Sequence, residues 1–213
     1  MADIFANLTR AEKLEAIRLL EGRERRIRET QIARYKPYPK QQEFHAAGLN
    51  HRERLFRAGN QLGKSYSGGA EAAYHLTGLY PDWWQGRRFT QPTSGWVGAP
   101  SGEIVRDGAQ KVLLGRADDW GTGMIPKRCI VDVQRASGVR DLADTVTVRH
   151  VSGGISRVKF KTYDQGRERW QAETLDWVVR RGVLHRALYR RLEPHQCNRR
   201  SRLAHLHPAA GRV

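Results

Sequence analysis

The sequence predicts an α/β fold with a mainly parallel sheet, because short apolar segments alternate with segments of helical character. Residues 53–58 (ERLFRA) are a strand candidate that leads directly into a glycine-bearing loop, and residues 65–76 follow with helical periodicity. A chain of 213 residues with 39% hydrophobic content can bury one core of ordinary domain size. We therefore expect one α/β domain.

Further strands and a helix are expected towards the C-terminus. Residues 95–99 (GWVGA) are typical of a buried strand, and a helix is expected at 101–114. Residues 145–150 and 156–163 alternate apolar and polar side chains, which indicates half-exposed strands.

The chain begins with a predicted surface helix. Thr9 and Glu12 fit a capping box, and an apolar stripe starts at Leu14. Pro37 and Pro39 end the helix, because proline lacks an amide donor and biases the residue before it towards extended structure.

The clearest motif is a phosphate-binding loop, which predicts the P-loop NTPase class. Residues 58–65 (AGNQLGKS) match GxxxxGKS except that Ala58 replaces the first glycine. Backbone amides at the N-terminus of the next helix would face the phosphates, Lys64 would contact the β- and γ-phosphates, and Ser65 would ligate Mg²⁺. The predicted nucleotide-binding residues here are Gly59, Asn60, Gln61, Leu62, Gly63, Lys64 and Ser65. The alternative is a chance GKS tripeptide in which Ser65 only caps the helix.

Gln41 is a second candidate for the nucleotide site. It lies about twenty residues before the loop in the string YKPYPKQQ, and a glutamine amide offers both the donor and the acceptor needed to recognise adenine. An ordinary polar loop would explain the string equally well.

The charge of the chain is unevenly distributed. Residues 178–213 hold nine arginines, no lysine and one acidic residue, so they carry +8 of the formal net charge of +16. This excess favours polyanionic partners. We divide the chain into an N-terminal helical segment at 1–34, a truncated P-loop domain at 35–177 and an irregular basic tail at 178–213.

Several observations limit the function classes. No apolar run approaches the roughly 18 residues of a membrane span, and the first residues lack a signal-peptide pattern, so a cytosolic protein is expected. Cys129 and Cys197 form neither a disulfide framework nor a metal motif, and we assign them no role.

Five strings resemble one known family. PYPKQQEFH, RAGNQLGKS, HLTGLYPDWWQGRRF, VRHVSGG and YDQGRERWQAETLD are similar, in this order, to the terminase large subunits of tailed bacteriophages. The resemblance covers about residues 30–177.

The resemblance implies an ATP- and Mg²⁺-dependent RecA-like ATPase domain, normally followed by a nuclease domain. Such proteins act in the host cytoplasm as oligomers, and their partners are double-stranded DNA, the terminase small subunit and the portal protein of the prohead. Gln41 corresponds to the family's glutamine motif. Many members carry arginine within the loop where this chain has Asn60, so Arg57 is a candidate replacement.

The string at 163–171 also resembles the family and follows a strand, where an α/β sheet presents ligand-binding groups. Gln165 and Arg167 are therefore candidates for sensing the γ-phosphate or coupling to DNA, although Arg167 would serve equally well as an ion-pair partner of Glu168.

The acidic residues that such an ATPase needs are missing. Mg²⁺ and the attacking water require an Asp and a Glu at the end of a second strand, and family members carry WFDEE just after the ETLD string. This chain has VVRRG at 178–182, and no carboxylate lies between Asp176 and Glu193. Nucleotide binding could survive, whereas hydrolysis should fail or be very slow.

A frameshift explains this loss. Codons for 178–182, taken one base later, can encode WFDEE. In the same shifted register, residues 189–200 can give TEGLNRTNATGG and residues 201–211 can give VAWLTFTPLQG, both of which resemble the family's continuation. We therefore expect residues from about Val178 onward to be out-of-frame translation that packs poorly.

Other interpretations remain open. The tail could be a genuine arginine-rich nucleic-acid-binding segment, and the chain could be another P-loop translocase or helicase, or a non-enzymatic basic DNA-binding protein. A zinc site is disfavoured, because the tail's residues lack a familiar ligand spacing; they are His195, Cys197, His205 and His207. Trp83, Trp84 and Trp96 are expected to pack rather than to stack on bases.

Overall fold

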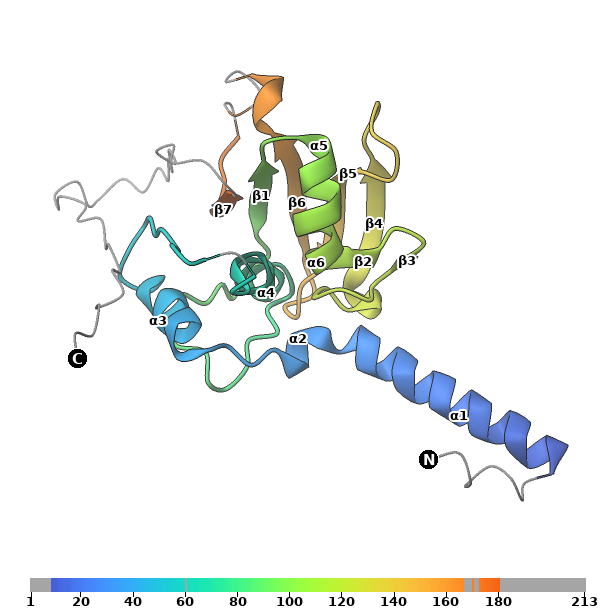
Figure 1. Cartoon of the computed structure of the whole chain (residues 1–213). Helices are drawn as coiled ribbons and strands as arrows, with labels where there is room; N and C mark the ends of the chain where they lie inside the picture. Colours follow the sequence, from blue (N-terminus) through green and yellow to red (C-terminus); the bar gives the residue numbers. More distant parts are fainter. Residues whose placement is uncertain (1–8, 60, 167–169, 171–172, 181–213) are drawn as a thin grey trace, which may run out of the picture.

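The computed structural model describes residues 9–59, 61–166, 170 and 173–180, and Figure 1 shows their arrangement. A five-stranded sheet has the strand order β4-β5-β6-β1-β7. Its strands are β1 (Ser94–Ala99), β4 (Ile130–Arg135), β5 (Ala143–Arg149), β6 (Ile155–Thr162) and β7 (Trp177–Arg180). A small antiparallel pair consists of β2 (Gly115–Arg116) and β3 (Asp119–Trp120). The predicted α/β class is confirmed.

The sheet is mixed, so the prediction of a mainly parallel sheet was wrong. Strand β1 pairs in parallel with both β6 and β7, whereas β4–β5 and β5–β6 are antiparallel. The connections explain the difference. Residues 136–142 and 150–154 are short links that can join only antiparallel neighbours, whereas parallel strands need a longer crossover.

Helices surround one end and one face of the sheet. They are α1 (Arg10–Glu29), α2 (Gln31–Arg34), α3 (Pro39–Ala47), α4 (Lys64–Thr77), and a continuous run of α5 (Gly102–Ile104), the π-helix η1 (Val105–Gln110) and α6 (Lys111–Leu114). Short 3-10 turns are η2 (Lys127–Cys129) and η3 (Tyr163–Gln165). The helices expected at 65–76 and 101–114 are thus present, the latter with a π-helical centre.

The predicted N-terminal helix is also present. The amide of Glu12 donates to the Thr9 hydroxyl, and the Glu12 carboxylate accepts from the Thr9 amide at 2.7 Å, which completes the capping box. Helix α1 extends away from the sheet in Figure 1, so its stripe stays largely in solvent: the side chains of Leu14 and Ile17 are 55% and 49% exposed.

The expected strand at 53–58 is not formed; within the part of the chain that the structure describes, Arg54 alone takes part in a β-bridge there. Two side chains hold this segment against α3 instead. The Phe56 ring stacks on Phe44 with ring centroids 4.9 Å apart, and the Arg54 guanidinium donates to the carbonyl of Phe44 at 2.7 Å. These anchors compete with strand pairing.

The core lies between the sheet and helices α4 to α6. Val97, Val146 and Val158 point from neighbouring strands into it, and all are at most 2% exposed. Trp84 and Trp96 are each 3% exposed, which confirms the expectation that they pack. No helix of the described residues is long and apolar enough to cross a membrane.

Strand β7 continues through the expected junction at residues 177 and 178. Trp177 is buried, its indole N–H donates to the Thr93 hydroxyl at 3.0 Å, and its ring packs against Gly95, where a side chain would collide with it. Val178 to Arg180 extend the same pairing along β1. β-Branched valines suit a parallel strand, so the pairing tolerates them. The tail at 181–213, with its histidines and Cys197, lies outside the described residues.

Candidate functional site: the phosphate loop

The loop before α4 has the backbone form of a phosphate-binding turn. Gly63 has φ of 72° and is the residue immediately before the helix, and Gln61 also takes a left-handed conformation with φ of 63°. These values reverse the chain so that α4 starts at Lys64. The first amides of this 14-residue helix have no acceptor within the helix, so they are available to an anion.

Lys64 sits within the turn of the loop. Its ammonium group donates to the carbonyl oxygens of Ala58 and Gly59, both at 2.6 Å. The loop thus wraps around the lysine, and the positive charge lies beside the helix N-terminus. Ser65 is half-buried at the second position of α4.

Gln41 contacts the phosphate loop from helix α3. Its segment is therefore helical, and not the ordinary polar loop given above as the alternative. The side chain is 4% exposed; its Oε1 accepts from the Tyr38 amide at 2.9 Å, and its Nε2 donates to the Leu62 carbonyl at 3.5 Å. A Cβ atom added at Gly63 would lie 2.8 Å from this Nε2. Helix α3 and the phosphate loop, two candidate segments that lie apart in the sequence, are therefore in contact.

A buried ionic network lies beneath the loop. Glu71 of α4, 6% exposed, accepts hydrogen bonds from His45 Nδ1 at 2.8 Å and from the Arg54 guanidinium, and His75 Nε2 lies 3.4 Å from its Oε1. Burial by itself raises the pKa of Glu71, but the bonds from His45 and His75 and the charge of Arg54 outweigh burial and hold it well below its ordinary value. Burial lowers the pKa of His75. The carboxylate is therefore ionised and paired at neutral pH.

This network was not among the features predicted from the sequence. A signal was present in α4, where Ser67, Glu71 and His75 recur at four-residue spacing and so share one side of the helix. That row lies in a helix otherwise rich in glycine and alanine, so its polar members had to find partners inside the protein.

Comparison with known proteins decides the family. The model of the terminase large subunit, T4likevirus-type, N-terminal, matches residues 55–179, more than half of the chain. The chain belongs to the terminase large-subunit family. It is also 40% identical over 195 residues to the terminase large subunit of Salmonella phage P22, an alignment that covers 82% of this chain and 39% of that protein. The chain thus spans about two fifths of that relative's length. No solved structure matches it.

The structure says less about the other candidate residues of this terminase region. Arg57 is exposed, and its role as the replacement arginine stays a prediction. Gln165 lies in η3, directly after the carboxyl end of β6. Asn60 and Arg167 lie outside the described residues.

The carboxyl end of β7 carries a cation, the side chain of Arg180. The Arg180 guanidinium lies 5.1 Å from the ring centroids of both Tyr163 and Trp170. Its strand is adjacent to α4, since a Cβ at Gly68 would lie 3.4 Å from Val179. In the described part of the terminase chain, no group of three or more His, Cys, Asp or Glu side chains could hold a metal ion.

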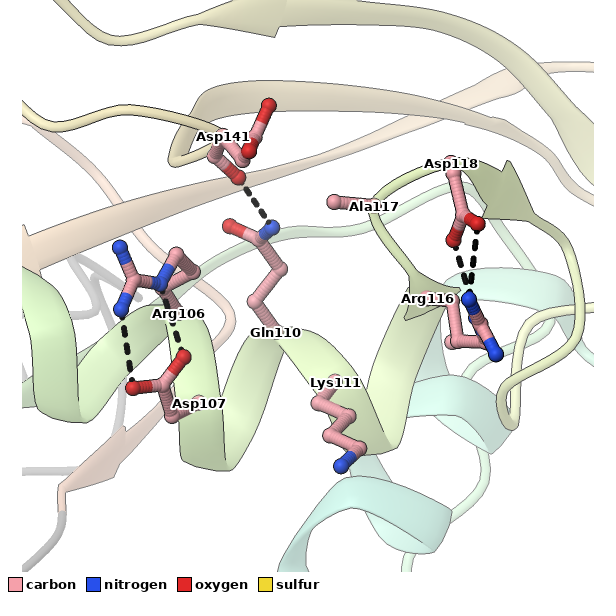
Figure 2. A pocket seen from close by; sticks show the side chains of 9 residues that line it. Arg106, Asp107, Gln110, Lys111, Arg116, Ala117, Asp118 and Asp141 are labelled. Atoms are coloured by element: carbon pink, nitrogen blue, oxygen red, sulfur yellow. Dashed lines mark hydrogen bonds and ion pairs between the residues drawn. The ribbon is translucent and has the colours of Figure 1, made fainter.

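One hollow, of about 380 Å³, is separate from the loop and lies beside η1 and α6 (Figure 2). Its charges cancel: Arg106 pairs with Asp107 at 2.8 Å, and Arg116 pairs with Asp118 at 2.9 Å. A smaller hollow of about 150 Å³ lies beside α3; it is lined by Gln42, His45, Trp83 and Gln85. Neither of these two hollows is lined by residues of the phosphate loop.

Proposed function

We propose that this chain is the ATP-binding portion of a phage terminase large subunit and that residues 59–65 bind the triphosphate of ATP. The observation that carries the proposal is Lys64, enclosed by its loop at the start of α4 and preceded by left-handed Gly63. Backbone amides, a helix dipole and an ammonium group then converge on one point, as recognition of an anion requires.

Each residue has a separate role in this proposal. The first amides of α4 and Lys64 would hold the phosphates, and the Ser65 hydroxyl would be the protein's ligand to Mg²⁺. The chemistry that Mg²⁺ supplies is neutralisation of phosphate charge. Gln41 has one amide hydrogen beyond its bond to Leu62, and we assign that hydrogen to an acceptor on the adenine ring.

We further propose that this chain binds ATP without hydrolysing it at an appreciable rate. Arg180 ends β7, where an acid is needed, and no carboxylate occurs between Asp176 and Glu193. An arginine there repels Mg²⁺ and cannot take a proton from water. Replacing VVRRG at 178–182 by WFDEE removes this positive charge and supplies carboxylates, so it should increase Mg²⁺-dependent binding of ATP. Unchanged binding would contradict the idea that Arg180 repels Mg²⁺.

The frameshift hypothesis is retained as the origin of the substitution, and the family match ends at residue 179, close to the expected junction. The nucleotide sequence around codons 175–185 tests it. If the next frame does not encode WFDEE, the basic tail is a feature of the protein itself.

For the complete protein we propose ATP-driven packaging of double-stranded DNA in the host cytoplasm, as a homo-oligomer that works with the terminase small subunit and the portal protein. The family membership supports this proposal. The P22 relative is a longer protein, of which the alignment with this chain covers 39%.

Titration with a fluorescent ATP analogue tests the site. Lys64→Ala should weaken binding by about tenfold to a hundredfold, the value of a hydrogen bond to a charged group. Lys127→Ala is the matched control, because Lys127 is an exposed lysine whose nearest carboxylate lies 3.7 Å away. Equal affinities of the two variants would refute the proposed site.

DNA binding separates this proposal from a purely basic DNA-binding protein. The alternative predicts salt-dependent DNA binding that Lys64→Ala leaves intact, together with no binding of ATP by the unmodified chain.

A further inference from the structure

Glu71 joins the three chain segments that border the phosphate loop. It belongs to the second turn of α4, the helix that starts in the loop. Its carboxylate accepts from His45 of α3 and from Arg54 of the segment that leads into the loop. One buried side chain therefore contacts all three segments at once.

On the α3 side, the network is linked to the predicted base-recognition residue. His45 follows Gln41 by four residues, so the two side chains leave α3 on the same side. His45 Nδ1 is 2.8 Å from Glu71, and Gln41 Nε2 is 3.5 Å from the Leu62 carbonyl. The bond to Glu71 thereby sets how close Gln41 comes to the loop.

On the other side, the network anchors the start of the loop. Arg54 donates to Glu71 and to the Phe44 carbonyl, and its guanidinium lies 4.5 Å from the centroid of the Phe44 ring. It stands four residues before Ala58, whose carbonyl accepts from Lys64. Arg54 therefore ties the incoming chain to both α3 and α4.

Stability alone does not account for an ionised group at this place. Apolar side chains of similar volume often stabilise a core as well as a buried ion pair does. Charge-assisted hydrogen bonds, unlike apolar contacts, fix direction and separation. The Glu71 side chain is 7% exposed and its hydrogen-bonded partner His45 is 1% exposed, so water does not replace their bond.

We propose that Glu71 is a positioning residue that holds α3 and its Gln41 at a fixed distance from the phosphate loop, so that the base and the triphosphate of a nucleotide bind as one unit. This inference rests on the proposed ATP site. It assigns Glu71 to recognition of the base through α3, and not to contact with the phosphates.

The test compares ATP with inorganic tripolyphosphate, which has no base, on the full chain in the presence of Mg²⁺. Glu71→Gln keeps the size of the side chain but removes its charge. It should weaken ATP binding about tenfold, the value of one or two hydrogen bonds to the base. It should change tripolyphosphate binding less than about twofold, because an amide oxygen can still accept from Arg54, which also keeps its bond to the Phe44 carbonyl.

Gln110→Ala is the matched control. Gln110 is 1% exposed and bonds to the Asp141 carbonyl and the Ala143 amide, away from the loop. This variant should lower the melting temperature while leaving the ratio of the two affinities unchanged. Should Glu71→Gln not fold, His45→Gln, which removes the Nδ1 donor to Glu71 and leaves Arg54 in place, should change the same ratio in the same direction.

Three results would overturn the inference. If Glu71→Gln weakens both ligands by the same factor, or weakens neither, then Glu71 does not position α3 for the base. If the unmodified chain fails to bind tripolyphosphate, the proposed phosphate site is wrong, and the inference is lost with it. Binding of tripolyphosphate with a changed ratio supports both.

Discussion

Replacing Gly63 by alanine should destabilise the chain through two separable effects. The residue has φ of 72°, and a left-handed conformation costs an alanine about 1–2 kcal/mol. The new methyl carbon would also lie 2.8 Å from Gln41 Nε2, closer than van der Waals contact allows. Gln41 must then shift, which weakens its bonds to Leu62 and Tyr38, each worth about 0.5–1.5 kcal/mol.

The expected loss in the free energy of unfolding is therefore about 2–4 kcal/mol, measured by urea denaturation with tryptophan fluorescence. Gly153→Ala isolates the backbone effect, because Gly153 has φ of 90° and nothing lies within 4 Å of an added Cβ. It should lose only about 1–2 kcal/mol. In a Gln41→Ala background, Gly63→Ala should likewise lose only the backbone part. The reasoning is refuted if Gly63→Ala and Gly153→Ala destabilise the chain equally in both backgrounds.

Three further outcomes are expected. The pKa of Glu71 in the folded chain lies well below its ordinary value of 4.5, so its contribution to stability is present above pH 4.5 and is lost as the pH falls towards the folded pKa. Glu71→Gln should therefore make the stability of the chain fall less steeply with acid. An unchanged slope would contradict the ionic network around Glu71. Gly22→Ala, inside α1 with open space around it, should raise helix content by circular dichroism and stabilise by up to about 1 kcal/mol, whereas a loss would indicate a contact there. Trp177→Phe should cost about 1–2 kcal/mol in urea denaturation by removing the indole bond to Thr93, and a smaller loss would show that bond to be unimportant.

Local patterns were sufficient for the elements that depend on local chemistry. The capping box of Thr9 and Glu12 formed because its partners are three residues apart, and α4 followed from the loop motif and its periodicity. The turn of the loop was predictable because the sequence has a glycine, Gly63, directly before Lys64, and glycine readily adopts the left-handed conformation found there.

Features set by distant partners were not predictable in this way. The direction of β5 depends on its short links to β4 and β6, and these links became visible only once β4 was known. The segment at 53–58 has strand propensity, but Arg54 finds its carboxylate 17 residues later, in α4, and holds the segment elsewhere. Propensity is a weak influence beside a buried ion pair that must be satisfied.

The place of β1 in the sheet also constrains the order of folding. The antiparallel strands β4, β5 and β6 are joined by short links and can assemble soon after they emerge from the ribosome. Strand β1 is synthesised earlier but must wait for β6 on one side and β7 on the other, and the bond from Trp177 to Thr93 closes a separation of 84 residues. Until β6 pairs, both edges of this glycine-containing apolar strand are open to other chains, and until β7 pairs one edge stays open. Slow synthesis or early termination before Trp177 should therefore expose this chain to aggregation through β1.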